Sequence, residues 1–233
     1  MSAHPVTEHV FRVSLTMVNV FLIVLPEGIT MVDAGLRRSF PRIAKAIEGL
    51  GRRPEEVTDI VVTHLHADHT GGLAEAREVT GARVWMHAAD ARMVGAGESR
   101  RPTEPSPGSF TGHLFGLFAG VTSAKIAPVA TDELVNDRQE IPVAGGLLPI
   151  WTPGHTAGHV AYLWPRDRGV LFVGDAATRG RAPSVSPIYE DYDRGLQSLR
   201  ELVALDFQVA CFSHGRSITE GAAATFAKTW GPR

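Results

Sequence analysis

Three histidines and one aspartate lie within six positions of the segment THLHADHTGG, residues 63–72. Residues two apart in an extended chain point to the same side, so His64 and His66 can bind one metal ion from the end of a strand. Asp68 and His69 are neighbours that point in different directions, which suits a second ion near the start of the following helix. A capping or surface role is the alternative, but chance produces this pattern in roughly one such chain in a thousand. The spacing therefore favours two metal ions over one.

Further ligands are needed, because zinc takes three or four protein ligands and two ions would share the four groups of this segment. His155 lies in a turn marked by glycine and proline, TPGHTAGH, and Asp175 ends the apolar segment VLFVGD. His214 ends a similar segment, QVACFSH. Each alone is more typical of a turn or cap, but a carboxylate at the end of an apolar strand needs a partner, and the arrangement recurs. We expect all three residues to complete the metal site.

The composition excludes several classes of protein. A single cysteine, Cys211, precludes an internal disulfide bond and fits a reducing compartment. The formal net charge of −2 indicates no basic surface for nucleic acid. The N-terminus lacks the pattern of a signal peptide, and the longest apolar run, residues 18–25, is too short to cross a bilayer. We therefore expect a cytoplasmic protein with a small-molecule substrate and with neither nucleic acid nor a membrane as partner.

The hydrophobic pattern predicts strands and helices along the whole chain. In the first half it predicts strands at 10–15, 18–25, 29–35, 58–64 and 82–87, and helices at 38–50, at 71–81 and from 88. In the second half it predicts strands at 125–130, 139–143, 146–154, 159–164, 169–175 and 208–214, and helices at 192–205 and 219–230. Two sheets packed face to face, with helices outside both, would bury these patterns. No linker divides the halves, so we predict a single domain over 1–233.

The segment at about 95–125 differs in composition from its surroundings. Its first part is rich in Gly, Pro, Ser and charge and its second part is aromatic and apolar, which predicts an inserted loop followed by a short helix. Phe115 and Phe118 of that helix could line a substrate pocket or a dimer contact, or pack on the core. The loop after VLFVGD offers Thr178, Arg179 and Arg181 as further substrate-binding candidates, unless it is simply a solvated loop.

Four motifs occur in the order THLHADH, TPGHTAGH, VLFVGDA and FSHG, and together they resemble the metallo-β-lactamase superfamily. The N-terminal segments VNVFLIVL and MVDAGL fit the same family, so the resemblance covers nearly the whole chain. It implies an α/β protein with the metallo-β-lactamase fold, a four-layer αββα sandwich whose site lies at the sheet edges.

The resemblance also implies which residues bind metal. The ligands fall into two sets and one shared residue: His64, His66 and His155; Asp68, His69 and His214; and the bridging Asp175. Asp33 would support the ligands from behind. We interpret His159 as a structural hydrogen-bonding residue behind the ligands, because the site is already filled without it.

This ligand set predicts a hydrolase. Two divalent ions about 3.5–4 Å apart can share a water and lower its pKa until a bridging hydroxide forms at neutral pH. The hydroxide would attack an activated acyl bond, a metal ion would stabilise the oxyanion, and the catalytic residue Asp68 would steer or accept a proton. Histidine and carboxylate ligands suit zinc, iron and manganese, of which we expect two Zn²⁺.

Within the superfamily, the chain resembles the glyoxalase II-like and lactonase-like branch, which implies a thioester or lactone substrate. Glyoxalase II adds a helical domain that holds glutathione, whereas residues 215–233 alone follow His214 here. N-acyl homoserine lactonases carry a tyrosine three residues after the bridging aspartate, where this sequence has Thr178. A mononuclear iron persulfide dioxygenase and, less favoured, a metal-dependent nuclease are the alternatives. The apolar insertion is compatible with a homodimer.

Overall fold

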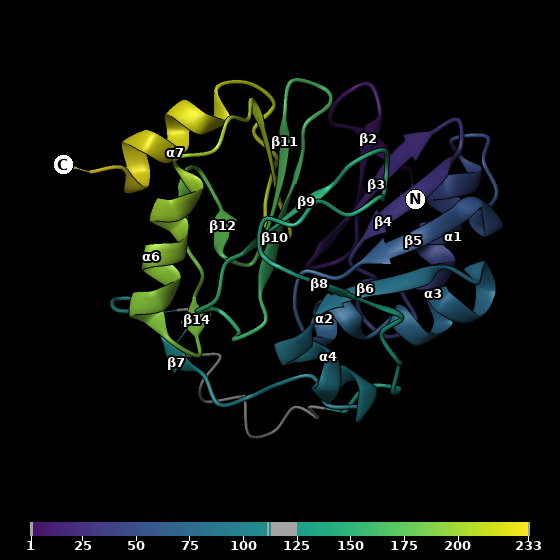
Figure 1. The fold of residues 1–233 in the computed structure, drawn as a ribbon, viewed down its shortest axis with the longest axis horizontal. Coiled ribbons are helices and arrows are strands. Elements are labelled where there is room, and N and C mark those ends of the chain that lie inside the picture. Colours follow the sequence, from purple (N-terminus) through teal and green to yellow (C-terminus); the bar gives the residue numbers. More distant parts are fainter. Residues whose placement is uncertain (1, 111, 113–124, 233) are drawn as a thin grey trace.

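The computed structural model describes residues 2–110, 112 and 125–232, which form two stacked β-sheets with helices on both outer faces (Figure 1). The N-terminal half, purple to blue, supplies all but the last strand of one sheet, and the C-terminal half, green to yellow, supplies the other sheet (Figure 1). Helices therefore form the two outer layers and sheets the two inner ones, as the sequence predicts.

The first sheet has the strand order β1-β2-β3-β4-β5-β6-β8. Pairs from β1 to β4 are antiparallel and pairs from β4 to β8 are parallel, so helical crossovers connect the parallel strands. The strands are β1 (His4–Pro5), β2 (Val10–Ser14), β3 (Asn19–Leu25), β4 (Gly28–Val32), β5 (Val57–Val61), β6 (Arg83–His87) and β8 (Glu133–Val135). The helices of this half are α1 (Phe40–Glu48), η1 (Pro54–Glu56), α2 (Ala67–Thr70), α3 (Leu73–Thr80) and α4 (Ala88–Gly95).

The second sheet has the strand order β15-β11-β10-β9. Its strands are β9 (Leu148–Trp151), β10 (Val160–Trp164), β11 (Val170–Gly174) and β15 (Val209–Phe212), and its helices are α6 (Tyr192–Leu202) and α7 (Ala222–Trp230). Two small pairs complete the strands: β12 (Ala177–Arg179) with β13 (Pro183–Val185), and β7 (Glu104–Pro105) with β14 (Ile188–Tyr189). In the part of the chain that the structure describes, no helix is long and apolar enough to cross a membrane.

Alternating side chains divide the core into three layers. In β3, Phe21 and Ile23 pack between the sheets, whereas Leu22 packs beneath the helices of the first half. In β11, Phe172 faces the space between the sheets and Leu171 faces the α6–α7 side. Strands buried on both faces read as continuous apolar runs, which is why these segments show little polar alternation. The predicted four-layer αββα sandwich is confirmed.

Two predicted strands are wrong. Residues 125–130 contain an isolated bridge from Lys125 to Glu98, and residues 139–143 contain an isolated bridge from Ile141 to Leu147, but neither segment forms a strand. Each contains a proline, Pro128 or Pro142, which cannot donate a ladder hydrogen bond. The strand that does form there, β8, lies between them. The predicted short helix with Phe115 and Phe118 lies outside the described residues.

Hydrogen bonds join the two sheets close to the predicted ligands. The Tyr162 hydroxyl of β10 donates to the carbonyl of Val62, directly after β5, at 3.0 Å. The amide of Asn19 in β3 donates to the carbonyls of Phe212 (3.0 Å) and Gly215 (2.8 Å), on either side of His214. The polar residue that interrupts the apolar run of β3 therefore attaches the end of β15 to the first sheet.

The buried Tyr162 hydroxyl supplies a test of this packing. Tyr162→Phe should lower the free energy of unfolding by about 1–2 kcal/mol, because one buried hydrogen bond is lost while the ring remains. Urea unfolding followed by circular dichroism measures the loss. Tyr192→Phe, at a half-buried tyrosine of α6, is the matched control and should change the free energy by less than about 0.5 kcal/mol. Equal losses in both variants would contradict the role of Tyr162.

Candidate metal centre

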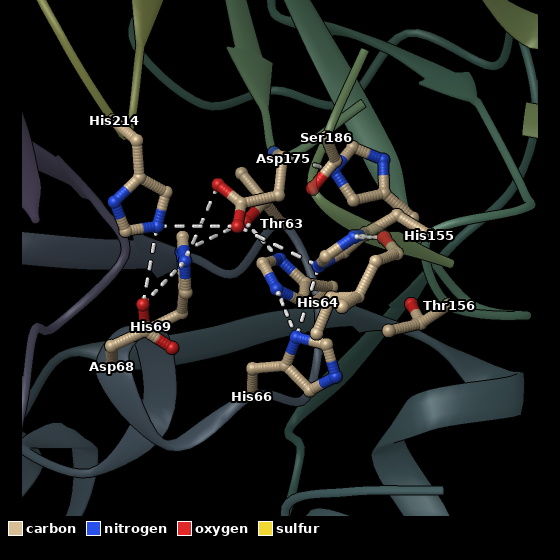
Figure 2. A network of polar contacts seen from close by, with 12 residues as sticks. Thr63, His64, His66, Asp68, His69, His155, Thr156, Asp175, Ser186 and His214 are labelled. Carbon is tan, nitrogen blue, oxygen red and sulfur yellow. Dashed lines mark hydrogen bonds and ion pairs between the residues drawn. The ribbon is translucent and has the colours of Figure 1, made fainter. Parts of the chain in front are cut away.

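Three histidine rings from both halves of the chain converge beside the end of β5 (Figure 2). His64 and His66 follow β5, and His155 lies in the loop between β9 and β10. His66 Nδ1 lies 3.1 Å from His64 Nε2 and 2.9 Å from His155 Nε2. Burial lowers the pKa of all three rings, to about 3 for His66, so each ring stays neutral and keeps a lone pair. We call these residues the three-histidine group.

A second group combines a carboxylate with two histidines. Asp68 and His69 lie in the short helix α2, and His214 follows β15. Asp68 Oδ2 is 3.2 Å from His214 Nε2 and 3.6 Å from His69 Nε2. We call these residues the aspartate group, and like the first it draws its members from both halves of the chain.

Asp175 lies between the two groups, at the end of β11 (Figure 2). Its Oδ2 is 3.2 Å from His214 Nε2 and 3.6 Å from His155 Nε2, and its Oδ1 is 3.6 Å from His69 Nε2. Gly174 makes this placement possible, because it has φ of +58° and a Cβ there would lie 2.5 Å from His159 Nε2. One carboxylate thus reaches histidines of both groups.

The electrostatics of the aspartate group favour positive charge. Burial disfavours ionised Asp68 and Asp175, yet His69 and His214 hold the pKa of both carboxyls below the usual range. Burial also opposes charge on His69, but Asp68 and nearby carboxylates raise its pKa well above the usual value. Asp175 is the main cause that raises the pKa of His214 to about 10. The fold therefore stabilises a cation at the point where these side chains meet.

Three of these histidines donate their Nδ1–H away from the centre, which directs Nε2 toward it. The acceptors are the Asp33 carboxylate for His69 (2.8 Å), the Ile188 carbonyl for His155 (2.9 Å) and the Met17 carbonyl for His214 (2.8 Å). Lone pairs that face one another repel unless a cation lies between them.

Buried atoms without partners test whether metal ions fit this site. His66 Nε2, His69 Nε2 and Asp175 Oδ1 are buried and form no hydrogen bond with the described residues. Such atoms cost about 1–3 kcal/mol each when unsatisfied. A divalent cation would satisfy the atoms of His69 and Asp175, and the potential ligand atoms of each group lie within 4.8 Å of one another. Neutral imidazole and carboxylate suit zinc, iron and manganese, so the residues fit such ions.

Asp33 connects the two groups from behind. Its carboxylate accepts from the backbone N–H of Thr63 (2.8 Å), from the Thr63 hydroxyl and from His69 Nδ1–H. Because the Thr63 hydroxyl donates to Asp33, its oxygen accepts from His64 Nδ1–H at 3.0 Å. One buried carboxylate therefore orients a histidine in each group, in the position that the sequence predicts for a supporting residue.

His159 holds the backbone of Asp175 and belongs to neither ligand group. Its Nε2 accepts from the Asp175 N–H at 2.9 Å, so its Nδ1–H donates to Thr152 Oγ1 at 2.8 Å. Both ring nitrogens are thus used in hydrogen bonds.

Two of the residues predicted to bind substrate form hydrogen bonds with other parts of the chain. Arg179 Nη1 donates to the carbonyls of Arg216 and Ser217, at 3.0 Å each, so this guanidinium holds the segment after His214. Thr178 Oγ1 lies 3.2 Å from Ser184 Oγ, and Arg181 is exposed. Contact of Thr178, Arg179 and Arg181 with substrate stays a prediction.

Two residues near the centre were not predicted from the sequence. Asp90 of α4 is completely buried and contacts both ligand loops of the three-histidine group. The sequence indicates the burial of Asp90, because Asp90 and Val94 are four residues apart and share the buried face of α4. Ser186 has a buried hydroxyl with no hydrogen-bond partner, and its backbone N–H donates to the Tyr189 hydroxyl at 3.0 Å. No pattern in the sequence distinguishes Ser186 from other loop serines.

Comparison with curated proteins identifies similar sequences in several bacteria. A hydroxyacylglutathione hydrolase from Pseudomonas aeruginosa is 33% identical over 138 residues, which are 58% of this chain and 40% of that protein. An uncharacterised protein of Bacillus subtilis is 30% identical over 170 residues, which are 71% of this chain and 64% of that protein. The chain thus spans only part of the length of these relatives.

Comparison with solved structures agrees with the observed layers. A native metallo-β-lactamase from Legionella gormanii has a TM-score of 0.75 at 17% identity, with 99% of this chain and 92% of that chain covered. A variant metallo-β-lactamase from Cronobacter sakazakii has a TM-score of 0.71 at 25% identity, with 92% and 81% covered. The family model described as the metallo-beta-lactamase superfamily matches residues 13–214, a span that includes both ligand groups. With its layers, its motifs and this match in agreement, the chain belongs to the metallo-β-lactamase superfamily.

Proposed function

We propose that this protein is a metal-dependent hydrolase that cleaves an activated acyl bond, a thioester or a lactone, of a small substrate. The observation that carries the proposal is the position of Asp175, whose carboxylate lies within 3.6 Å of histidines of both groups. A shared carboxylate suits two ions held side by side. When bound, two divalent ions would supply a Lewis acid for a carbonyl oxygen and lower the pKa of a water.

The two groups would hold one ion each, with Asp175 common to both. The ligand set carries two carboxylates among histidines that are neutral when they bind metal, so two dications would leave the site positive. Such a site attracts a carbonyl oxygen or an anionic substrate. Zinc is the metal we propose, because imidazole and carboxylate oxygen are among its common ligands.

Asp68 is the residue we assign to proton transfer. Its side chain and that of His214 are each 27% exposed, whereas Asp175 is 8% exposed. Substrate therefore reaches Asp68 and His214 before the deeper ligands. An ionised Asp68 carboxylate at this position can orient a water or accept its proton while the acyl bond breaks.

One observation supports an acyl substrate, and a second argues against a thiol nucleophile. The Pseudomonas aeruginosa relative is named for the hydrolysis of a hydroxyacylglutathione, which is a thioester. No serine or cysteine nucleophile is required, and the single cysteine, Cys211, is buried with a pKa raised to about 12.

Replacement of Asp68 tests its assigned role. Asp68→Ala should lower kcat/KM on the best thioester or lactone by about 10²–10⁴-fold, because proton transfer and one carboxylate ligand are lost together. Asp206→Ala, at an exposed aspartate, is the matched control and should leave kcat/KM unchanged. Steady-state kinetics supply the measurement, and circular dichroism checks that both variants are folded. Near-wild-type turnover of Asp68→Ala would refute this mechanism.

Removal of metal tests the number and kind of ions. A chelator should abolish hydrolysis and lower the melting temperature, and added Zn²⁺ should restore both, because ions that bind the native state stabilise it by about 2.7 kcal/mol at 100 times Kd. Elemental analysis of the purified protein should give two metal ions per chain. One iron per chain, together with oxygen uptake on a persulfide, would instead establish the dioxygenase alternative.

A further inference from the structure

Asp90 of α4 has a completely buried carboxylate that accepts four hydrogen bonds. Oδ2 accepts from the backbone N–H of Leu65 at 3.1 Å and from the Thr156 hydroxyl at 2.7 Å. Oδ1 accepts from the backbone N–H of Gly158 at 3.1 Å and from Arg101 Nη1 at 2.6 Å. Both oxygens are therefore fully used as acceptors.

The donors to Asp90 lie beside metal-ligand candidates from both halves of the chain. Leu65 stands between His64 and His66, and Thr156 directly follows His155. The first loop follows a strand of the first sheet and the second connects β9 to β10 of the other sheet. Asp90 is thus a direct hydrogen-bonded connection between the two loops that form the three-histidine group.

The loop after His155 packs tightly against Asp90. A Cβ on Gly158 would lie 2.5 Å from Cγ of Asp90 and 2.7 Å from its backbone nitrogen, so glycine is required at this position. Thr156 is itself completely buried. The loop after His155 therefore rests directly on the carboxylate of Asp90.

Two carboxylates, those of Asp90 and Glu190, share the guanidinium of Arg101. Arg101 Nη1 also lies 3.2 Å from Glu190 Oε1, and Glu190 Oε2 accepts from the backbone N–H of Ala157 at 2.8 Å. Burial opposes the charge of Arg101, but Asp90 and Glu190 raise its pKa. The Arg101 guanidinium thus joins Asp90 to Glu190, which itself holds the loop after His155 through the N–H of Ala157.

We propose that Asp90 is a positioning residue that sets the affinity of the three-histidine group for its metal ion. It does so by fixing the loop of His64 and His66 against the loop of His155. The contacts of Asp90 described above do not include a member of the aspartate group, so the second ion should be far less affected. The inference rests on the metal binding in the proposed function, but not on the acyl substrate.

An amide cannot replace this carboxylate. In Asp90→Asn the new NH₂ group must face either Leu65 and Thr156 or Gly158 and Arg101, and a backbone N–H donor is present on both sides. One loop therefore loses its acceptor while the size of the side chain is kept. Loss of a residue that orients ligands typically costs about 10–100-fold in metal affinity.

The experiment isolates each metal group in the full chain. His214→Ala removes one ligand of the aspartate group, and His155→Ala removes one ligand of the three-histidine group. In both backgrounds the metal-free protein is titrated with Zn²⁺ against a chromogenic chelator. Co²⁺ absorption spectra report the coordination of the remaining ion. The titrations are then repeated with Asp90→Asn added.

In the His214→Ala background, Asp90→Asn should weaken Zn²⁺ binding about 10–100-fold and alter the Co²⁺ spectrum. In the His155→Ala background it should change affinity less than about threefold. Thr156→Val, which removes a single donor and keeps the shape, should shift affinity in the same direction but less, and it replaces Asp90→Asn if that variant does not fold.

Asp59→Asn is the matched control. Asp59 is another buried carboxylate, which accepts from Trp85 Nε1 at 2.8 Å and pairs with Arg83 at 3.0 Å, both in β6. It should lower stability without changing either metal affinity. A loss of affinity in Asp59→Asn equal to that in Asp90→Asn would show a general effect of destabilisation and overturn the inference.

Other outcomes separate this inference from the proposed function. Unchanged affinity in the His214→Ala background, or equal losses in both backgrounds, would overturn the role of Asp90 alone. A selective loss in a protein that hydrolyses no thioester or lactone would overturn the acyl substrate alone. A wild-type chain that binds neither Zn²⁺ nor Co²⁺ would overturn both.

Discussion

The convergence of histidine nitrogens and carboxylate oxygens at one point is the constraint on which the arrangement of this molecule depends. Histidine nitrogens and carboxylate oxygens of both groups face one another, and some of these atoms lack any hydrogen-bond partner. The side chains cannot turn away, because His69, His155 and His214 are each held by a hydrogen bond from the opposite ring nitrogen. A buried polar atom without a partner is unfavourable, and a bound metal ion would satisfy such atoms of His69 and Asp175.

This constraint explains why the site lies between two sheets. Each group combines residues after β5 with one residue from the second half, so neither sheet alone has a complete set of ligands. The hydrogen bonds of Asn19 and Tyr162 join the sheets at this end, and Asp33 and Asp90 fix the loops that leave it. The complete site therefore requires both sheets in their packed arrangement.

The sequence was informative where the relevant contacts are local. The short spacing of His64, His66, Asp68 and His69 indicates a metal site directly, and apolar runs predict the strands of both sheets. It was misleading at 125–143, where prolines interrupt apolar runs and β8 pairs with β6 far away in the chain. Asp90 was missed because its four donors come from separate segments, and a helix periodicity shows only that it is buried. A long-range hydrogen bond leaves no local pattern.

The two groups differ in how deeply their side chains are buried. The rings of the three-histidine group are buried and are held by Thr63, Ile188 and, through their loops, Asp90. The aspartate group is more open, because Asp68 and His214 are partly exposed. His214 donates a hydrogen bond to the carbonyl of Met17, whose side chain is itself exposed. Under the proposed function, a substrate that approaches from this side meets the carboxylate of Asp68 before the buried rings of the deeper group. Supporting hydrogen bonds reach both groups, since Asp33 holds His69 and the Met17 carbonyl holds His214, so the groups differ in their exposure and not in their support.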